Sequence, residues 1–224
     1  AGALAGDMRC ATVLGALGGP DETRHFGSAK DWAERDPSDF LPSFHTLAVE
    51  CRGQPDLLLP RLPGLPDAAF GWSRDVLPSE VRSAVNARLM PSRGAVLWDL
   101  GSLGGSVAIE WMRAAPDAVA VHIDDDADRL DAARRNAEDL GTPRLHLING
   151  AAPAVLRAIA RPEGTGPDLR VPDAVFLGDP VEELIESCWQ RLRPTARIAA
   201  IGRTLQAEMA LQSTYARLGG ELCR

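Results

Sequence analysis

Long apolar runs, a targeting segment and paired cysteines are all missing from this 224-residue chain. No apolar stretch approaches the roughly 20 residues that a bilayer-spanning helix needs, so we expect no membrane span. The opening residues, AGALAGDMRC, lack the basic start and long apolar centre of a signal peptide. The four cysteines are isolated from one another: Cys10, Cys51, Cys188 and Cys223. None belongs to a C-x-x-C pair or has a histidine at ligand spacing, which predicts free thiols in a cytoplasmic protein and no metal site.

Clustered basic residues are missing as well. The net charge is -7, and the arginines are scattered, with only Arg134 and Arg135 adjacent. Binding to nucleic acid requires Lys and Arg gathered on one face to neutralise phosphates, so we expect no nucleic-acid partner. What the chain does contain is ordinary for a globular protein, with 45% hydrophobic and 25% charged residues.

A proline-rich stretch divides the chain unequally. Residues 56–70, DLLLPRLPGLPDAAF, contain three prolines, and proline fixes φ and removes a backbone donor, so we expect an extended linker there. Upstream, residues 11–14 and 46–49 are predicted strands, and a short helix is expected near Asp21. These few elements bury little apolar surface, so we expect residues 1–55 to be a partial domain.

Downstream, in residues 71–224, short apolar strands alternate with helices. Such strands require a parallel sheet covered on both faces, which predicts an α/β fold with a doubly wound, mostly parallel sheet and a small N-terminal α+β appendage. Ligands of such sheets bind at the carboxyl ends of the strands. The predicted strands are 95–100, 118–123, 145–148, 174–177 and 197–201, and residues 221–224 look like the start of another. The predicted helices are 80–89, 104–115, 126–140, 153–160, 181–192 and 205–218.

The most informative stretch is 95–112, AVLWDLGSLGGSVAIEWM. An apolar strand ends in Asp99, passes through Gly101, Gly104 and Gly105, and becomes a helical pattern. Glycines permit a tight turn and a close approach of backbone to a ligand at a helix N-terminus, which is the pattern of a nucleotide-cofactor loop. The residues of this loop indicate a site for S-adenosylmethionine (SAM) rather than for NAD.

Two later strand ends add to this pattern. Asp124 ends the second strand about 25 residues after the loop, where an acidic side chain can bind both ribose hydroxyls. The alternative is that residues 124–126 only cap the following helix. Residues 150–153, GAAP, end the third strand with small side chains, where an adenine ring could lie. The alternative there is an ordinary strand-to-helix turn.

Several segments of the sequence together resemble one family, the precorrin-6Y C5,15-methyltransferases of cobalamin biosynthesis. Residues 62–224 are similar to the decarboxylating C15-methyltransferase half in LPGLPDAAF, EVRS, LWDLGSLGGSVAIEWM, AAPDAVAVHIDDDADR, RNAEDLG, PDAVFLG and LGGEL. Upstream, TVLGALGGPDE and TLAVE resemble the tail of the C5-methyltransferase half. The resemblance implies that residues 1–55 are the tail of a tetrapyrrole methylase-like domain. It also implies that residues 71–224 are a SAM-dependent methyltransferase domain truncated at its C-terminus.

This resemblance implies a Rossmann-like fold that binds SAM, methyl transfer to a carbon of a tetrapyrrole (precorrin) substrate, decarboxylation of an acetate side chain, and a homo-oligomer. The expected cofactor-binding residues are Asp99, Gly101, Ser102, Gly104, Gly105, Asp124, Asp125, Gly150, Ala151 and Ala152. The expected substrate-binding residues are Trp72, Arg74 and Gly178. Methyl transfer needs its reactants held in line more than it needs a fixed base, so no catalytic residue is assigned.

The sequence departs from the family pattern where the family faces its pocket. Leu103 stands where the family loop D-x-G-x-G-x-G has its middle glycine, and residues 72–78 match none of the family's H-D-G-Q-x-T-K. Asp179 and Pro180 replace glycines beside the tetrapyrrole, and residues 199–206 lose an asparagine and a glutamate. These changes keep a second hypothesis open, a non-catalytic relative that serves as a scaffold or binding protein. An RNA methyltransferase on the same fold is a weaker third hypothesis, because the chain is acidic.

Overall fold

Two units make up the chain in the computed structural model, Ala1–Leu59 and Pro60–Arg224. The structure describes residues 9–28, 31, 32, 34, 42–51, 59–159, 169 and 171–223. Each unit has a sheet of its own.

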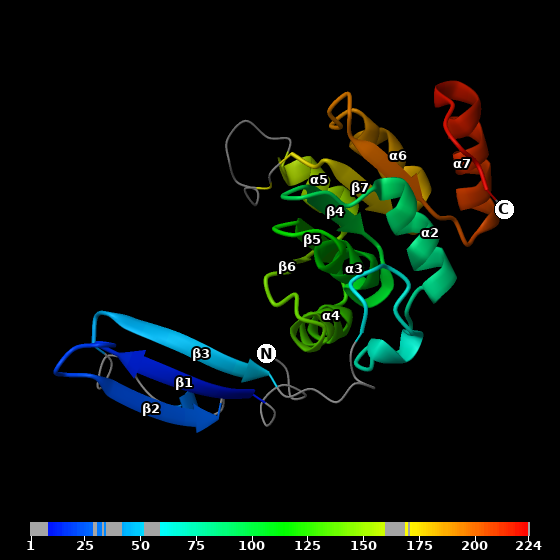
Figure 1. The fold of residues 1–224 in the computed structure, drawn as a ribbon. Helices are drawn as coiled ribbons and strands as arrows, with labels where there is room; N and C mark the ends of the chain where they lie inside the picture. Colours follow the sequence, from blue (N-terminus) through cyan, green and yellow to red (C-terminus); the bar gives the residue numbers. More distant parts are fainter. Residues whose placement is uncertain are drawn as a thin grey trace. The chain divides into compact units, whose positions relative to one another are not determined.

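The first unit contains a three-stranded antiparallel sheet in the order β2-β1-β3 (Figure 1). Its strands are β1 (Arg9–Gly15), β2 (Thr23–Ser28) and β3 (His45–Cys51). The predicted strands at 11–14 and 46–49 are confirmed. The prediction of a helix near Asp21 is wrong, because this residue lies in the β1–β2 hairpin turn, where the Gly18 N–H donates to Glu22 Oε2 at 2.8 Å. The residues after the turn then pair with β1 as a strand.

Five parallel strands form the sheet of the second unit, in the order β6-β5-β4-β7-β8. They are β4 (Val96–Leu100), β5 (Val119–Asp124), β6 (His146–Asn149), β7 (Ala174–Leu177) and β8 (Arg197–Ala200). β4 comes first in the chain and lies at the centre, with β5 on one side and β7 on the other. The predicted doubly wound sheet is confirmed, and its order reverses between β4 and β7.

Helices cover both faces of this sheet (Figure 1). They are α2 (Ser79–Leu89), α3 (Ser106–Ala114), α4 (Ala127–Asp139), α5 (Ala152–Ile159), α6 (Val181–Trp189) and α7 (Leu205–Leu218). α3 contacts α2 and α4, and α6 contacts α5 and α7. The two groups of three helices form the outer layers, one on each face of the sheet.

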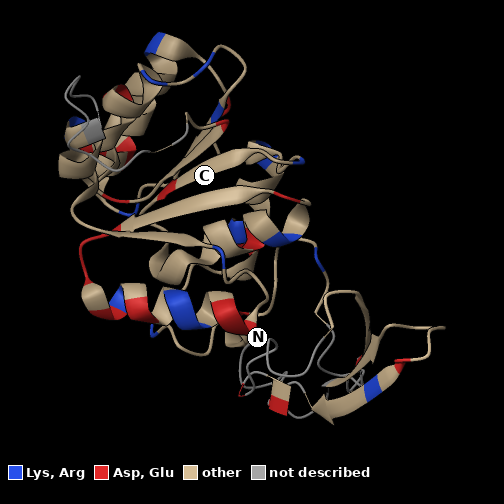
Figure 2. Cartoon of the chain, turned by 90° about the vertical axis from the view of Figure 1, so that its left-hand side faces the viewer, with Lys and Arg blue, Asp and Glu red and all other residues tan. Residues whose placement is uncertain are grey.

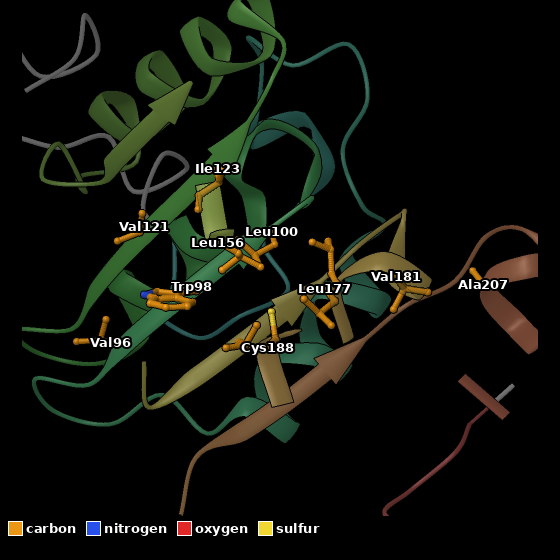
Figure 3. Packing of buried hydrophobic residues seen from close by; sticks show 12 residues of the cluster. Val96, Trp98, Leu100, Val121, Ile123, Leu156, Leu177, Val181, Cys188 and Ala207 are labelled. Carbon is orange, nitrogen blue, oxygen red and sulfur yellow. The ribbon is translucent and has the colours of Figure 1, made fainter. Parts of the chain in front are cut away.

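The core on one face of the sheet comes from alternate residues of its strands. All five residues of β4 are buried, because successive side chains point to opposite faces and helices cover both. Val96, Trp98 and Leu100 pack in one cluster with Leu156 of α5 and Cys188 of α6 (Figure 3). The central strands are therefore packed against α5 and α6, the helices that begin at the carboxyl edge of the sheet after β6 and β7.

Residues 60–70 of the expected linker are part of the second unit and pack on its helices. Leu65 is 1% exposed. Arg82 of α2 and Glu110 of α3 are fully buried and form an ion pair at 2.9 Å. Glu110 also accepts hydrogen bonds from the backbone N–H groups of Gly64 at 2.9 Å and Leu65 at 3.0 Å. A buried charge pair thus ties this segment to two helices.

Acidic and basic residues are interspersed along the ribbon of the second unit in the view of Figure 2. On α4, Arg134 pairs with Asp131 at 2.6 Å and with Glu138 at 3.0 Å, and Arg135 pairs with Asp131 at 2.8 Å. Pairs at these spacings lie on one helix face. The two adjacent arginines are therefore neutralised by acids of their own helix.

The C-terminal residues 221–223 have no regular structure, so the expected strand start is wrong for them. Arg88 holds Glu221 at 2.6 Å, which turns this segment back toward α2. No helix in the described ranges has the length and apolar character needed to cross a membrane.

Candidate functional site

A cleft of about 220 Å³ opens at the carboxyl ends of β5, β4 and β7, and we call it the switch-point cleft. It is lined by Leu100, Gly101, Ile123, Asp124, Asp125, Arg129, Ala151, Ala152, Pro153, Asp179, Pro180, Glu183 and Leu184. A larger hollow of about 310 Å³ lies around Ala95, Asp173 and Arg197, at the amino ends of the strands. Ligands of open parallel sheets bind outside the carboxyl ends, so the smaller switch-point cleft is the candidate site.

Two glycines meet where the strand order reverses. Gly101 follows β4 with φ +108°, and an added Cβ would lie 3.2 Å from the Cα of Gly178, which follows β7. An added Cβ on Gly178 would overlap the carbonyl oxygen of Gly101. The N–H of Gly178 donates to the Leu100 carbonyl at 2.8 Å. Both positions therefore require glycine, and Gly101 presents bare backbone to the cleft.

Asp99 shapes the loop after β4 and does not line the cleft. Its fully buried carboxylate accepts hydrogen bonds from the Ser102 N–H at 3.0 Å, the Ala108 N–H at 3.1 Å and the Ser102 hydroxyl. Ala108 lies in the first turn of α3, where backbone N–H groups lack helical partners and favour negative charge. Asp99 and Ser102 thus fix the loop against the helix.

The rest of the loop is a single 3-10 turn, Leu103–Gly105, that leads into α3. Gly104 and Gly105 have φ values of +60° and +67°, and an added Cβ on Gly104 would overlap the Ser73 hydroxyl. Leu103 is half-buried and is not among the residues that line the cleft. Gly104 takes up the bend one residue later than the family's middle glycine, so the leucine leaves the cleft open.

Asp124, at the end of β5, is bound by Arg129 of α4. The guanidinium donates to both carboxylate oxygens at N–O distances of 2.6, 2.8 and 3.1 Å, and the Asp126 N–H donates at 2.9 Å. Burial alone would raise the pKa of Asp124, but hydrogen bonds from Arg129 and Asp126 and the positive charge of Arg129 lower it overall. Asp126 caps α4 by accepting from the N–H groups of Asp128 and Arg129. The capping role therefore belongs to Asp126, and Asp124 lines the cleft.

One imidazole spans the two strand ends that border the cleft. His122 of β5 is fully buried, with its Nδ1 3.4 Å from Asp99 Oδ2 and its Nε2 4.0 Å from Asp124 Oδ2. The side chain lies between the acid that fixes the glycine loop and the acid that faces the cleft. A substitution of His122 would therefore alter the surroundings of both carboxylates.

Small side chains follow β6, as the sequence predicts. The Gly150 N–H donates to the backbone carbonyl of Asp124 at 2.9 Å, which ties this turn to the end of β5. Ala151, Ala152 and Pro153 line the cleft. Because they project little beyond the backbone, this end of the cleft has room for a flat ring.

Asp179 and Glu183 give the cleft an acidic side after β7. Asp179 Oδ2 accepts from Arg203 Nε at 3.1 Å. Its other oxygen, Oδ1, is buried and has no hydrogen-bond partner among the described residues. The sequence marks Asp179 only as a replacement for glycine, and it gives no signal for Glu183 or Arg129, whose approach to the cleft depends on the sheet order.

The loop that carries Trp72 and Arg74 is anchored on α4. The Trp72 indole N–H donates to Asp139 Oδ2 at 2.7 Å, and the Arg135 guanidinium lies 4.7 Å from the ring centre. The Trp72 backbone N–H donates to Asn136 Oδ1 at 3.2 Å. Neither Trp72 nor Arg74 is among the lining residues, so both stay predictions as substrate contacts.

The structure thus divides the expected cofactor-binding residues into two groups of equal size. The first group lines the cleft: Gly101, Asp124, Asp125, Ala151 and Ala152. The second group shapes the turns around it: Asp99, Ser102, Gly104, Gly105 and Gly150.

Known proteins resemble this chain in sequence and in fold. A model of the family described as "Precorrin methyltransferase domain" matches residues 69–224. This chain belongs to the precorrin methyltransferase family. A relative from Sinorhizobium sp, named precorrin-6Y C(5,15)-methyltransferase (decarboxylating), is 32% identical over 216 residues, which are 95% of this chain and 49% of that protein. The chain therefore spans about half the length of the curated relatives it matches.

Likeness to solved structures places the fold of the second unit among Rossmann-like methyltransferases. The C-terminal domain of precorrin-6Y C5,15-methyltransferase from Rhodobacter capsulatus has a TM-score of 0.65 and 36% identity, covering 74% of this chain and 85% of that one. A SAM-dependent O-methyltransferase from Thermotoga maritima has a TM-score of 0.58 over 96% of this chain and 78% of its own. Its 15% identity makes it a likeness of fold alone.

Proposed function

We propose that this chain is a SAM-dependent C-methyltransferase of cobalamin biosynthesis, which methylates C15 of a precorrin with decarboxylation. The family supports this, as does the name of the Sinorhizobium relative. The observation that carries the proposal is the switch-point cleft, which is bordered by the small residues after β6, by Asp124, by Gly101 and by Asp179.

The lining residues fit the parts of SAM one after another. Ala151 and Ala152 leave space for adenine, and the Asp124 carboxylate is an acceptor for ribose hydroxyls. Gly101 has no side chain to obstruct the amino-acid part, and the unpaired Oδ1 of Asp179 is an acceptor at that end. The residues present therefore fit the cofactor.

The charge of the cleft favours a cationic ligand as well. Its charged lining residues are four acids and one base: Asp124, Asp125, Asp179, Glu183 and Arg129. SAM, when bound, supplies an electrophilic methyl group on a positively charged sulfur. The chain's own contribution is to hold both reactants in line and to exclude water, which requires no fixed base, so no catalytic residue is assigned.

For the substrate, we propose contacts with Trp72, Arg74 and Gly178. An aromatic face and an exposed guanidinium suit a carboxylated macrocycle. The conjugated macrocycle itself can take up the electron pair that decarboxylation leaves. By resemblance we also propose a homo-oligomer, which light scattering of the purified chain would test.

Isothermal titration of the 224-residue chain with SAM and with its demethylated product, S-adenosylhomocysteine, tests the proposal. We expect both to bind, and a precorrin incubated with chain and SAM to gain one methyl group and lose carbon dioxide in its mass spectrum. Absence of binding at millimolar ligand would leave the scaffold hypothesis standing. Methylation of RNA but not of precorrin would favour the third one.

A further inference from the structure

Among the described acids that line the cleft, Asp179 is the one with a buried carboxylate oxygen that has no hydrogen-bond partner. Its Oδ2 is held by Arg203 Nε at 3.1 Å, whereas Oδ1 is buried with no hydrogen-bond partner. The Asp124 carboxylate, by contrast, has both oxygens bound by Arg129. The carboxylate oxygen that still lacks a hydrogen-bond donor therefore lies on the β7 side of the cleft.

A buried carboxylate oxygen without a donor is costly, and a cationic donor satisfies it best. Burying a polar group costs free energy unless the group is hydrogen-bonded, and hydrogen bonds from a charged donor are about twice as strong as those between neutral groups. Oδ1 itself is buried, but the Asp179 side chain as a whole is 22% exposed and lines the cleft, so a rotation of the carboxyl group about its own bond would present this oxygen to a ligand. Arg203 holds the carboxylate at the cleft and acts as a positioning residue.

Sheet order sets where on a ligand this acceptor falls. β5, β4 and β7 are neighbours, so the ends carrying Asp124 and Asp179 are two strand spacings apart, roughly 10 Å. Gly101, on the strand between them, presents bare backbone. A nucleoside held by its ribose at Asp124 would therefore extend its 5′ substituent across Gly101 toward Asp179.

We propose that Asp179 accepts a hydrogen bond from the α-ammonium group of the amino-acid part of SAM, a specificity contact that rests on the proposed function. Ammonium is the only donor on that part of the cofactor. Because the product S-adenosylhomocysteine keeps this ammonium, Asp179 recognises both. It does not recognise 5′-methylthioadenosine, which has the same nucleoside and lacks the amino acid.

The test compares Asp179→Asn with the unaltered chain in calorimetric titrations of these three ligands. Asparagine keeps the size of the side chain and removes its charge, so we expect affinity for SAM and for S-adenosylhomocysteine to fall by about 10- to 100-fold. Affinity for 5′-methylthioadenosine should stay within about twofold. Glu182→Gln, which removes an exposed charge three residues away outside the cleft, is the matched control and should change none of the three.

The other possible results would contradict the proposed contact between Asp179 and the ammonium group. An equal loss for 5′-methylthioadenosine would mean that the substitution damages the cleft as a whole. A loss for SAM alone would place the sulfonium, not the ammonium, near Asp179. If Asp179→Asn binds all three ligands as tightly as the unaltered chain does, this inference is overturned and the proposed function stays intact. If the unaltered chain binds neither SAM nor S-adenosylhomocysteine, the proposed function itself is overturned. Arg203→Gln, which leaves the carboxylate in place but unheld, should show the same pattern as Asp179→Asn at smaller size.

Discussion

Gly178 packs against Gly101 so closely that neither residue has room for a Cβ atom. The two glycines follow β7 and β4, the neighbouring strands between which the sheet order reverses. Their contact sets how near the two strand ends lie, and the switch-point cleft opens beside it. Residues far apart in the chain thus act together as one structural element of the site.

Gly178→Ala should disturb both stability and binding. The added methyl group would overlap the Gly101 carbonyl, a backbone atom that cannot move without moving β4. We expect the free energy of unfolding in urea to fall by about 1–3 kcal/mol and the affinity for S-adenosylhomocysteine to fall with it. Gly71→Ala is the control, because its nearest neighbour would be 3.9 Å away. An unchanged Gly178→Ala variant would show that the strand ends separate freely.

Arg129→Gln should strengthen cofactor binding. The guanidinium occupies the Asp124 oxygens that ribose hydroxyls would need, and its side chain is 44% exposed, so the pair is worth at most about 1 kcal/mol. We therefore expect S-adenosylhomocysteine to bind up to about fivefold more tightly in calorimetry. Arg134→Gln, which breaks ion pairs on the same helix outside the cleft, should leave the affinity unchanged. Weaker binding by Arg129→Gln would mean that Arg129 itself contacts the ligand.

Asp124 should contribute to stability in a way that acid removes. Its pKa lies below the ordinary 3.8 in the folded chain, because Arg129 and the Asp126 N–H outweigh burial. The folded state therefore binds its proton less readily than the unfolded state, and the stabilisation is complete above about pH 4. It is lost as the pH falls through the lowered value. Melting temperatures of the unaltered chain and of Asp124→Asn should accordingly differ near neutral pH and converge in acid, and a constant difference would contradict this.

Much of the fold was predictable because its signals are local. Each apolar strand of the parallel sheet is followed by a helical pattern, and Asp126 caps α4 through N–H groups two and three residues away. The strand Thr23–Ser28 was not predictable in this way, because it depends on pairing with β1. Local sequence near Asp21 favours a helix start, and the hairpin overrides it.

The site was predictable to the extent that its residues come directly after strands. Gly101 and Asp124 follow strand ends, so topology alone brings them to one edge. Arg129 is five residues from Asp124, so this pair is local, but it depends on the direction in which α4 leaves β5. Arg203 reaches Asp179 across 24 residues, and that ion pair depends on tertiary geometry, which no spacing in the sequence records.

Cys188 should resist thiol reagents that modify the other described cysteines. Burial in the cluster of Figure 3 raises the pKa of its thiol from 9.0 to about 12, which reduces the thiolate population roughly a thousandfold. In native chain treated with iodoacetamide, mass spectrometry should find Cys223 and Cys10 modified and Cys188 intact. In urea all three should react. Modification of Cys188 at the rate of Cys223 in the native chain would show that α6 opens readily.

Glu110→Gln should be the most destabilising of these substitutions. Arg82 and Glu110 are both fully buried. Without the Glu110 charge, the half-exposed Asp67 is the acid left beside Arg82 among the described residues, so we expect a cost of about 3–5 kcal/mol. Glu110 also accepts from the N–H groups of Gly64 and Leu65, so the segment before α2 should loosen and become sensitive to protease. Asp117→Asn removes an exposed ion pair with Arg93 and should cost less than about 1 kcal/mol in the same urea titration. Equal costs for the two variants would contradict this prediction, because Glu110 differs from Asp117 both in its burial and in the two backbone N–H groups that it accepts from.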